Sequence, residues 1–209
     1  MKRFFPLVIA VLAGWPAAAF PADETIPLDG RWRFQLDRAD AGVRENWAAK
    51  KLPGQIHLPG SLPALDVGGA AWFQRDFTIP KTWTGRRVAL ALEWAHGETR
   101  AWVDGEISGT NNSPSTPHEY DFGPLAPGRH TLTLRAAGDN FDGLLGDLSL
   151  RATPLVWIQD LQVCPHVATR SVTVTGSVGS APGLSGQNGM VFYVDGKLLQ
   201  SVVVNWGTN

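Results

Sequence analysis

The sequence predicts an all-β protein, and three observations support this prediction. Apolar and polar residues alternate over short segments, which is typical of half-buried strands. These segments are residues 30–36, 71–79, 87–95, 99–105 and 130–136. No window keeps a 3.6-residue apolar period, and the best helical candidate, residues 39–52, suits only a turn or two. The pairs Asp104-Gly105 and Asp195-Gly196 match type I′ hairpin turns, which need positive φ at both central residues.

The strand expected at residues 87–95 indicates a two-layer arrangement. Its large side chains share one face and its small ones the other. The large residues are Val88, Leu90, Leu92 and Trp94, and the opposite face carries Ala89, Ala91 and Glu93. Small residues opposite large ones indicate that the second face is also partly covered, as in a β-sandwich.

The chain divides into three parts. Residues 1–22 carry two cations, an apolar run and small residues, which together predict a secretory signal peptide and export to a bacterial periplasm or the medium. Residues 23–153 form a first β-sandwich. Pro154 interrupts the strand pattern, and residues 154–209 hold about four more strands, half of an immunoglobulin-like sandwich.

Composition narrows the possible partners. The formal net charge of −1 offers no basic surface, so nucleic acid is not an expected partner. No second long apolar run follows the signal peptide, so no membrane partner is expected. The single cysteine, Cys164, cannot form an internal disulfide, and its strand-like setting predicts a buried, inert thiol.

No catalytic constellation is visible in the sequence. Phosphate loops, a GxSxG elbow, HExxH and paired-cysteine spacings are missing. A glycosidase needs two carboxylates in one cleft, but those here fall in turns or on outward strand faces, such as Asp76 and Glu93. We therefore expect no catalytic residue, metal or cofactor in this chain, which by itself is expected to be inactive.

Two loops carry candidate ligand groups. Residues 108–123 concentrate hydrogen-bonding side chains, and Asp139, Asn140 and Asp142 surround Phe141. Planar carboxylates and amides beside an aromatic ring suit a pyranose, which presents both hydroxyls and C–H faces. The alternative is that Asn, Asp, Gly and Pro are the ordinary residues of loops.

The strand expected at residues 71–79 raises a separate question. Phe73, Phe77 and Ile79 should face the core, with Arg75 between them. Because an unpaired buried cation is very costly, we predict that Arg75 pairs with an Asp or a backbone carbonyl. Trp72 falls on the other face, near the rim, where it would pack on the next domain, line the sugar site or cover the edge of the sheet.

Several motifs occur in an order that resembles one enzyme family. They are "LDGRWRF", "LPGS", "AWFQRDFTIP", "WVDG", "TPHEYD" and "LAPGRH". Across about residues 26–153 they resemble the N-terminal sugar-binding domain of family 2 glycoside hydrolases, which include β-galactosidases, β-glucuronidases and β-mannosidases. The following "LVWIQDLQVCP" is similar to the start of the immunoglobulin-like second domain of these enzymes.

The resemblance implies a jelly-roll (galactose-binding-like) sandwich, an immunoglobulin-like sandwich and then a (β/α)₈ barrel with a catalytic Glu pair. This chain has no barrel and no Asn-Glu dipeptide, the family's acid/base signature, so no catalytic residue is carried over. By position, the loop with Asp66 before Trp72 and the loop with Asp139, Asn140 and Asp142 correspond to loops that reach the substrate.

Two functions follow as hypotheses. The first is a non-catalytic carbohydrate-binding portion of a secreted family 2 glycoside hydrolase. The parent activity would be retaining hydrolysis of β-glycosides such as β-galactosides, and the catalytic barrel would lie outside this chain. The second is a structural or interaction module that binds no sugar.

Overall fold

A computed structural model describes residues 24–62, 69–95, 97–138, 143–180, 186–194 and 197–206. The expected signal peptide and the Asp195-Gly196 turn lie outside these ranges. Within them, regular structure is almost entirely antiparallel strand, with two single 3₁₀ turns at Trp47–Ala49 and Lys81–Trp83. The all-β prediction is therefore confirmed, and the helical candidate at residues 39–52 supplies only one of these turns.

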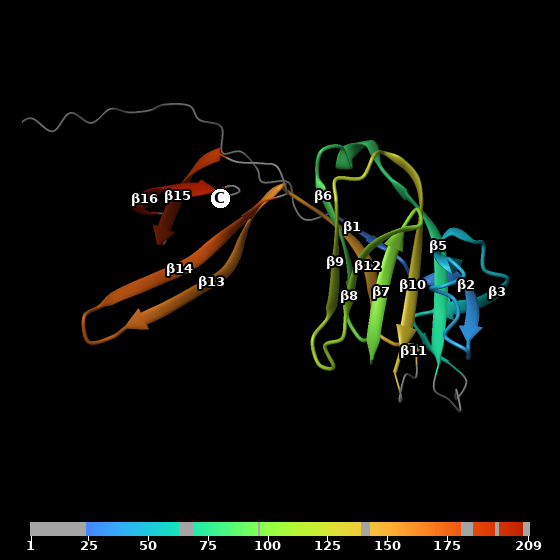
Figure 1. Cartoon of the computed structure of the whole chain (residues 1–209). Helices are drawn as coiled ribbons and strands as arrows, with labels where there is room; N and C mark the ends of the chain where they lie inside the picture. The colour runs from blue at the N-terminus through green and yellow to red at the C-terminus, as the bar shows by residue number, and fades with distance from the viewer. Residues whose placement is uncertain are drawn as a thin grey trace, which may run out of the picture.

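The first sandwich is built from two antiparallel sheets. The four-stranded sheet has the order β1-β12-β6-β9, and the six-stranded sheet has the order β3-β2-β5-β10-β7-β8 (Figure 1). The short strands β4 and β11 pair with each other. The strands are β1 (Glu24–Pro27), β2 (Gly30–Asp37), β3 (Gly54–Leu58), β4 (Gly60–Ser61), β5 (Ala70–Ile79), β6 (Arg87–Leu92), β7 (Glu98–Val103), β8 (Glu106–Asn111), β9 (His118–Gly123), β10 (Gly128–Ala137), β11 (Gly143–Leu144) and β12 (Leu148–Thr153).

The predicted hairpin turn and core face are largely confirmed. Asp104 and Gly105 have φ values of 53° and 88°, as a type I′ turn between β7 and β8 requires. Side chains of β6 and β10 fill the space between the sheets, with Leu90 and Leu134 fully buried. Trp94 was expected on the same inner face as Leu90 and Leu92. This prediction is wrong, because β6 ends at Leu92 and Trp94 is 63% exposed.

The aromatic strand β5 also confirms its predicted inner face. Phe73, Phe77 and Ile79 are buried. The guanidinium of Arg75 donates to the carbonyls of Leu28, at 3.0 Å, and Asp29, at 2.7 Å. The prediction of a carbonyl-paired arginine is confirmed, and the backbone before β2 supplies the acceptors.

The outer face of the six-stranded sheet is covered by the segment between β2 and β3, which was not predicted. Trp72 is fully buried there and stacks on Trp102, with ring centroids 5.0 Å apart. Its Nε1 donates to the carboxylate of Asp37 at 3.0 Å, which also accepts the backbone N–H groups of Ala41 and Gly42. A second small core therefore lies outside the sandwich and explains a tryptophan among the polar residues of this strand.

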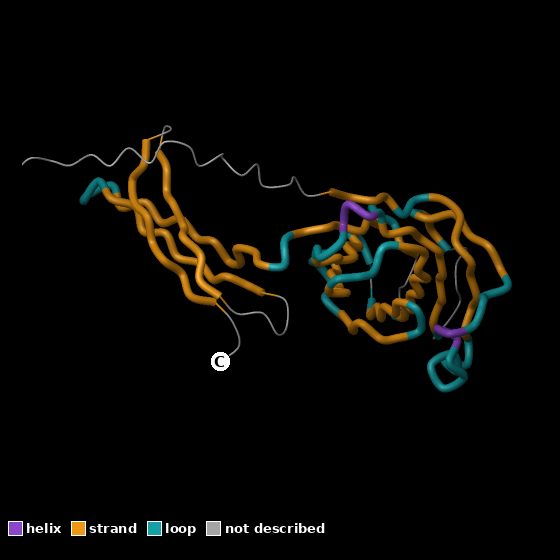
Figure 2. The backbone as a smooth tube through the Cα atoms, turned by 90° about the horizontal axis from the view of Figure 1, so that it is seen from above, coloured by secondary structure: helices purple, strands orange, loops and turns teal. Residues whose placement is uncertain are grey.

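The four strands expected after Pro154 are present as two separate hairpins, which Figures 1 and 2 show beside the sandwich. Cys164 is exposed on the first hairpin, so the prediction of a buried thiol is wrong. The Arg87 guanidinium of the sandwich lies 4.3 Å from the ring centroid of Trp157. These strands are β13 (Val156–His166), β14 (Ser171–Ser180), β15 (Gly186–Val194) and β16 (Lys197–Trp206).

Candidate functional site

The two loops singled out by the resemblance begin and end next to each other. Their candidate residues Asp66, Asp139, Asn140 and Asp142 lie outside the described residues, but the strands that carry the loops are described. On one side Ser61 pairs with Gly143, and on the other Ala70 pairs with Ala137. Residues 63–68 and 139–142 therefore leave and re-enter the sandwich at neighbouring points.

The backbones at these points approach so closely that glycine is required. Gly143 has φ of +131°, and a Cβ on it would lie 2.3 Å from the carbonyl oxygen of Gly60. Gly97 has φ of +106°, and a Cβ there would lie 2.4 Å from the carbonyl oxygen of Ala137. Both the positive φ and the missing space favour glycine, so the ends of these loops are tightly positioned.

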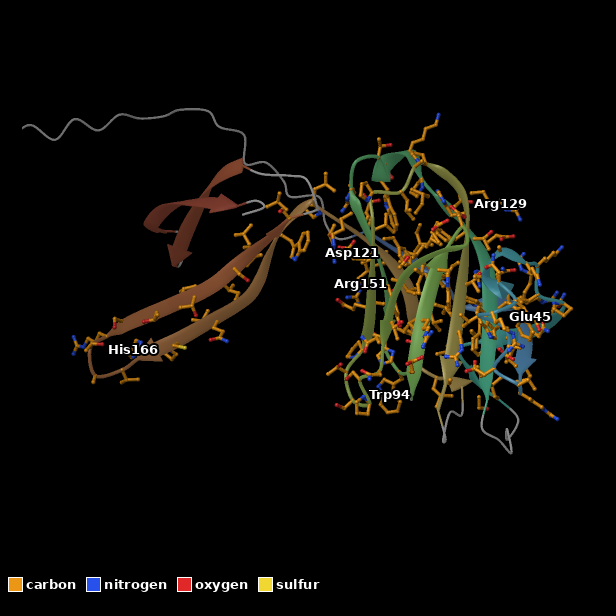
Figure 3. All side chains as sticks on the ribbon, viewed as in Figure 1. Glu45, Trp94, Asp121, Arg129, Arg151 and His166 are labelled. Carbon is orange, nitrogen blue, oxygen red and sulfur yellow. The ribbon has the colours of Figure 1, made fainter. Side chains whose placement is uncertain are left out.

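Trp94 lies at the same end of the sandwich, on a backbone held on both sides (Figure 3). The Glu93 N–H donates to the carbonyl of Asp147 at 3.0 Å, and the Leu145 N–H donates to the carbonyl of Trp94 at 3.3 Å. Ala95 forms a β-bridge with Leu144. The exposed indole is thus presented from a fixed segment that runs beside the end of the 139–142 loop.

A cleft of about 350 Å³ opens beside this indole. One wall is formed by Glu93, Trp94 and Ala95, and the other by residues 114–117, a Pro-Ser-Thr-Pro turn. The volume is at the small end of the range for ligand sites, roughly 300–1,000 Å³. An aromatic face, a carboxylate and two hydroxyls are groups that can bind the C–H face and the hydroxyls of one sugar ring.

A buried polar network holds the second wall of the cleft. His118 is fully buried, and its Nε2 donates to the carbonyl of Ser113 at 2.8 Å. Its Nδ1 lies 2.6 Å from the Thr99 hydroxyl, which also lies 2.5 Å from the Tyr120 hydroxyl. Burial raises the pKa of Tyr120, which stays a protonated donor to the Thr99 carbonyl. His118 therefore ties the turn at residues 114–117 to the core.

Sequence reasoning and structure differ on which residues form the site. Trp72 has no exposed surface, so burial supports the covering role that the sequence also offered for it. Trp94 was expected in the core and instead lines the cleft with Glu93. His118 and Tyr120 lie two residues apart in the quoted "TPHEYD" motif. Residues at i and i+2 of a strand point to the same face, and this spacing was the sequence pattern that could have predicted their shared burial.

The described ranges contain no group of three or more His, Cys, Asp or Glu side chains that could hold a metal ion. No helix in the same ranges is long and apolar enough to cross a membrane.

Comparisons with known proteins point to one kind of enzyme. No protein-family model matches the chain. A β-glucuronidase of Paenibacillus borealis is 29% identical over 124 residues, covering 53% of this chain and 21% of that protein. The β-glucuronidase of Rattus norvegicus is 26% identical over 138 residues, covering 54% of this chain and 21% of the rat protein. The chain thus spans about a fifth of the length of these curated relatives.

Solved structures give the same fold. The β-glucuronidase from Ruminococcus gnavus in complex with uronic deoxynojirimycin matches with a TM-score of 0.66 and 15% identity, covering 87% of this chain and 38% of that one. An uncultured Clostridium sp. β-glucuronidase matches with a TM-score of 0.66 and 19% identity, covering 88% of this chain and 39% of that one. Both matches extend beyond the first sandwich.

The fold is thus a β-sandwich similar to the N-terminal domains of family 2 glycoside hydrolases. Over about half of its length the chain is similar in sequence to β-glucuronidases, which supports the resemblance to family 2 glycoside hydrolases that the ordered motifs indicated.

Proposed function

We propose that this chain is a non-catalytic, carbohydrate-binding N-terminal portion of an exported family 2 glycoside hydrolase. The whole enzyme would hydrolyse β-glycosides with retention. β-Glucuronides are the first substrates to test, because the relatives named above are β-glucuronidases. β-Galactosides, the example that the sequence suggested, are the second.

One observation carries the proposal: an exposed Trp94 on a fixed backbone lines a sugar-sized cleft with Glu93. The paired ends of the 63–68 and 139–142 loops lie at the same end of the sandwich. Asp66, Asp139, Asn140 and Asp142, which lie outside the described residues, remain candidates for further acceptors of sugar hydroxyls. This arrangement supplies part of a binding site, so weak affinity is expected for the chain alone.

Binding is tested by NMR titration of the ¹⁵N-labelled chain with the methyl β-glycosides of glucuronic acid, galactose and mannose. The Trp94 indole N–H and the amides of Ser115 and Thr116 should shift with at least one of them. Trp94→Ala should abolish the shifts of these two amides. Ile107→Ala, a control that removes an apolar side chain 61% exposed on β8, should leave them unchanged. Titrations without any response would contradict the proposal.

The absence of catalysis is tested separately. The purified chain should release no nitrophenol from nitrophenyl β-glucuronide, β-galactoside or β-mannoside above a boiled control. Turnover of any of the three would show that the chain itself carries a catalytic pair.

Export is tested by locating the mature N-terminus. Cells producing the full sequence should deliver to the periplasm or medium a chain that begins near residue 23. Protein that keeps Met1 in the cytoplasm would argue against a signal peptide.

An exposed apolar face favours the second candidate function, an interaction module without sugar binding. It lies on the β13–β14 hairpin and consists of Ile158, Leu161, Val163, Val172 and Val174, each at least 37% exposed. Light scattering should then show a stable oligomer that Val163→Lys disrupts. Thr173→Lys, on the opposite face of the same hairpin, is the matched control. A monomer that responds to sugar would exclude this candidate.

A further inference from the structure

Glu93 also lines a second cleft, of about 430 Å³. Glu93, just beyond the end of β6, thus lines both clefts. The second cleft is formed by residues of β1, β12 and the turns around them. Its lining residues are Thr25, Pro27, Asp29, Pro59, Glu93, Asp147, Leu148, Ser149 and Arg151.

The walls of the second cleft are held by backbone hydrogen bonds. Strands β1 and β12 are paired, with Pro27 opposite Ser149. The Leu28 N–H donates to the carbonyl of Leu148 at 2.8 Å, and Leu148 itself is buried beneath the cleft. The Glu93 N–H donates to the neighbouring Asp147 carbonyl, as described above. The cleft is therefore preformed by the sheet.

The size of the two clefts indicates what they can hold together. Each is near the lower limit for a small-molecule site, which suits one sugar ring. Because Glu93 lines both clefts, a ring on Trp94 can be linked to a second ring placed between Pro59 and Ser149. The carboxylate of Glu93 would accept hydroxyls from both rings near the linkage.

The charge of the lining selects among such ligands. Asp29, Glu93 and Asp147 contribute three carboxylates, and Arg151 contributes one cation. Arg151 of β12, which Figure 3 shows apart from Trp94, also lies 3.8 Å from the carboxylate of Glu119. The lining is therefore acidic, and it repels an anionic sugar at distances shorter than the screening length of about 10 Å.

We propose that these two clefts form one groove for a neutral saccharide of at least two rings, with Glu93 at the junction. This inference rests on the proposed function, because it assigns the substrate class of the Trp94 cleft. A uronic acid is disfavoured in this groove, whereas the β-glucuronides proposed above are substrates to test for hydrolysis by the whole enzyme.

The test compares glucose, cellobiose and cellobiouronic acid, of which the last differs from cellobiose by one carboxylate. NMR titration at pH 7 reports on the first cleft through Ser115 and on the second through Ser149. Cellobiose should shift both amides and bind at least about tenfold more tightly than glucose, since a second ring adds contacts without a second association event. Cellobiouronic acid should bind more weakly than cellobiose.

A variant that fills the second cleft separates this inference from the proposed function. Ser149→Trp should reduce cellobiose affinity to that of glucose and leave glucose binding unchanged. Thr110→Trp, at an exposed strand position on β8, is the control and should change neither. Equal affinities for glucose and cellobiose, or tighter binding of cellobiouronic acid, would overturn the groove and leave a one-ring site. No binding of any sugar would overturn the proposed function as well.

Discussion

At the scale of single residues, several charged side chains of the sandwich are held in ion pairs. Asp76 was visible in the sequence as an outward carboxylate, but its partners were not. It accepts a bidentate pair of hydrogen bonds from Arg33, at 2.7 and 3.0 Å, and further ones from Arg129 and Thr131. The Arg33 guanidinium, helped by Arg129 and Thr131 against a partial burial, holds the pKa of Asp76 well below its usual range.

The Asp76 cluster predicts a pH-dependent contribution to stability. The pKa of Asp76 is lower in the folded protein than in the unfolded chain, where it is about 3.9. Its ionised carboxylate therefore stabilises the fold above about pH 4, and this contribution is lost as the pH falls through the folded-state pKa. Asp76→Asn should therefore lower the free energy of unfolding at pH 7 by about 1–3 kcal/mol. In urea unfolding, the difference in free energy of unfolding between the parent and Asp76→Asn should become smaller below about pH 4.

Asp121 provides the comparison for this prediction. It pairs with Arg87 at 2.7 Å but is 41% exposed. Asp121→Asn should cost less than about 1 kcal/mol, as exposed pairs do. Equal losses for the two variants would show that the Asp76 cluster has no special role.

At the scale of elements, the segment between β2 and β3 depends on one carboxylate. Asp37 is buried and accepts from Ala41, Gly42 and Trp72. Asp37→Ala leaves these donors without an acceptor, and unsatisfied buried groups cost about 1–3 kcal/mol each. The variant should lose about 2–5 kcal/mol in urea unfolding, within the range of large single-site effects.

Near-UV circular dichroism should also report the release of the Trp72–Trp102 stack in this variant. Glu45→Ala in the same segment removes an exposed partner of the Trp47 indole and is the control. It should change stability by less than about 0.5 kcal/mol. An unchanged Trp signal in Asp37→Ala would argue against the anchoring role.

The turn at residues 114–117 is a second element that depends on a buried side chain. His118→Phe keeps an aromatic ring but removes the donor to the Ser113 carbonyl and the nitrogen that contacts the Thr99 hydroxyl. We expect faster hydrogen exchange at residues 115–116 and weaker sugar shifts, with a loss of about 1–3 kcal/mol in stability. His118→Gln, whose amide is also a donor, should recover part of the protection. No difference in exchange between Phe and Gln would contradict this role of His118.

At the scale of the whole molecule, neither sheet of the first sandwich contains a strand from β13–β16. A chain ending after Thr153 should therefore keep the all-β circular dichroism spectrum and a cooperative thermal transition. The loss of the Arg87–Trp157 contact should cost only about 0.5–2 kcal/mol. An unfolded spectrum for the shortened chain would show that the hairpins are needed for folding.

Local patterns in the sequence determined much of this fold. Alternation predicted β2, β5, β7 and β10, because the side-chain period of a strand is a local property. The pairing of Arg75 followed from the cost of burying a bare cation, and the ordered motifs indicated the resemblance to family 2 glycoside hydrolases.

Tertiary structure decided where function can reside. Whether Trp72 or Trp94 meets solvent depends on segments far away in the chain: residues 38–53 cover the first, while the end of β6 exposes the second. The pairing of Ser61 with Gly143, which brings the two candidate loops together, is equally nonlocal. Burial and proximity are set by contacts between distant segments, and alternation along one strand carries no record of them.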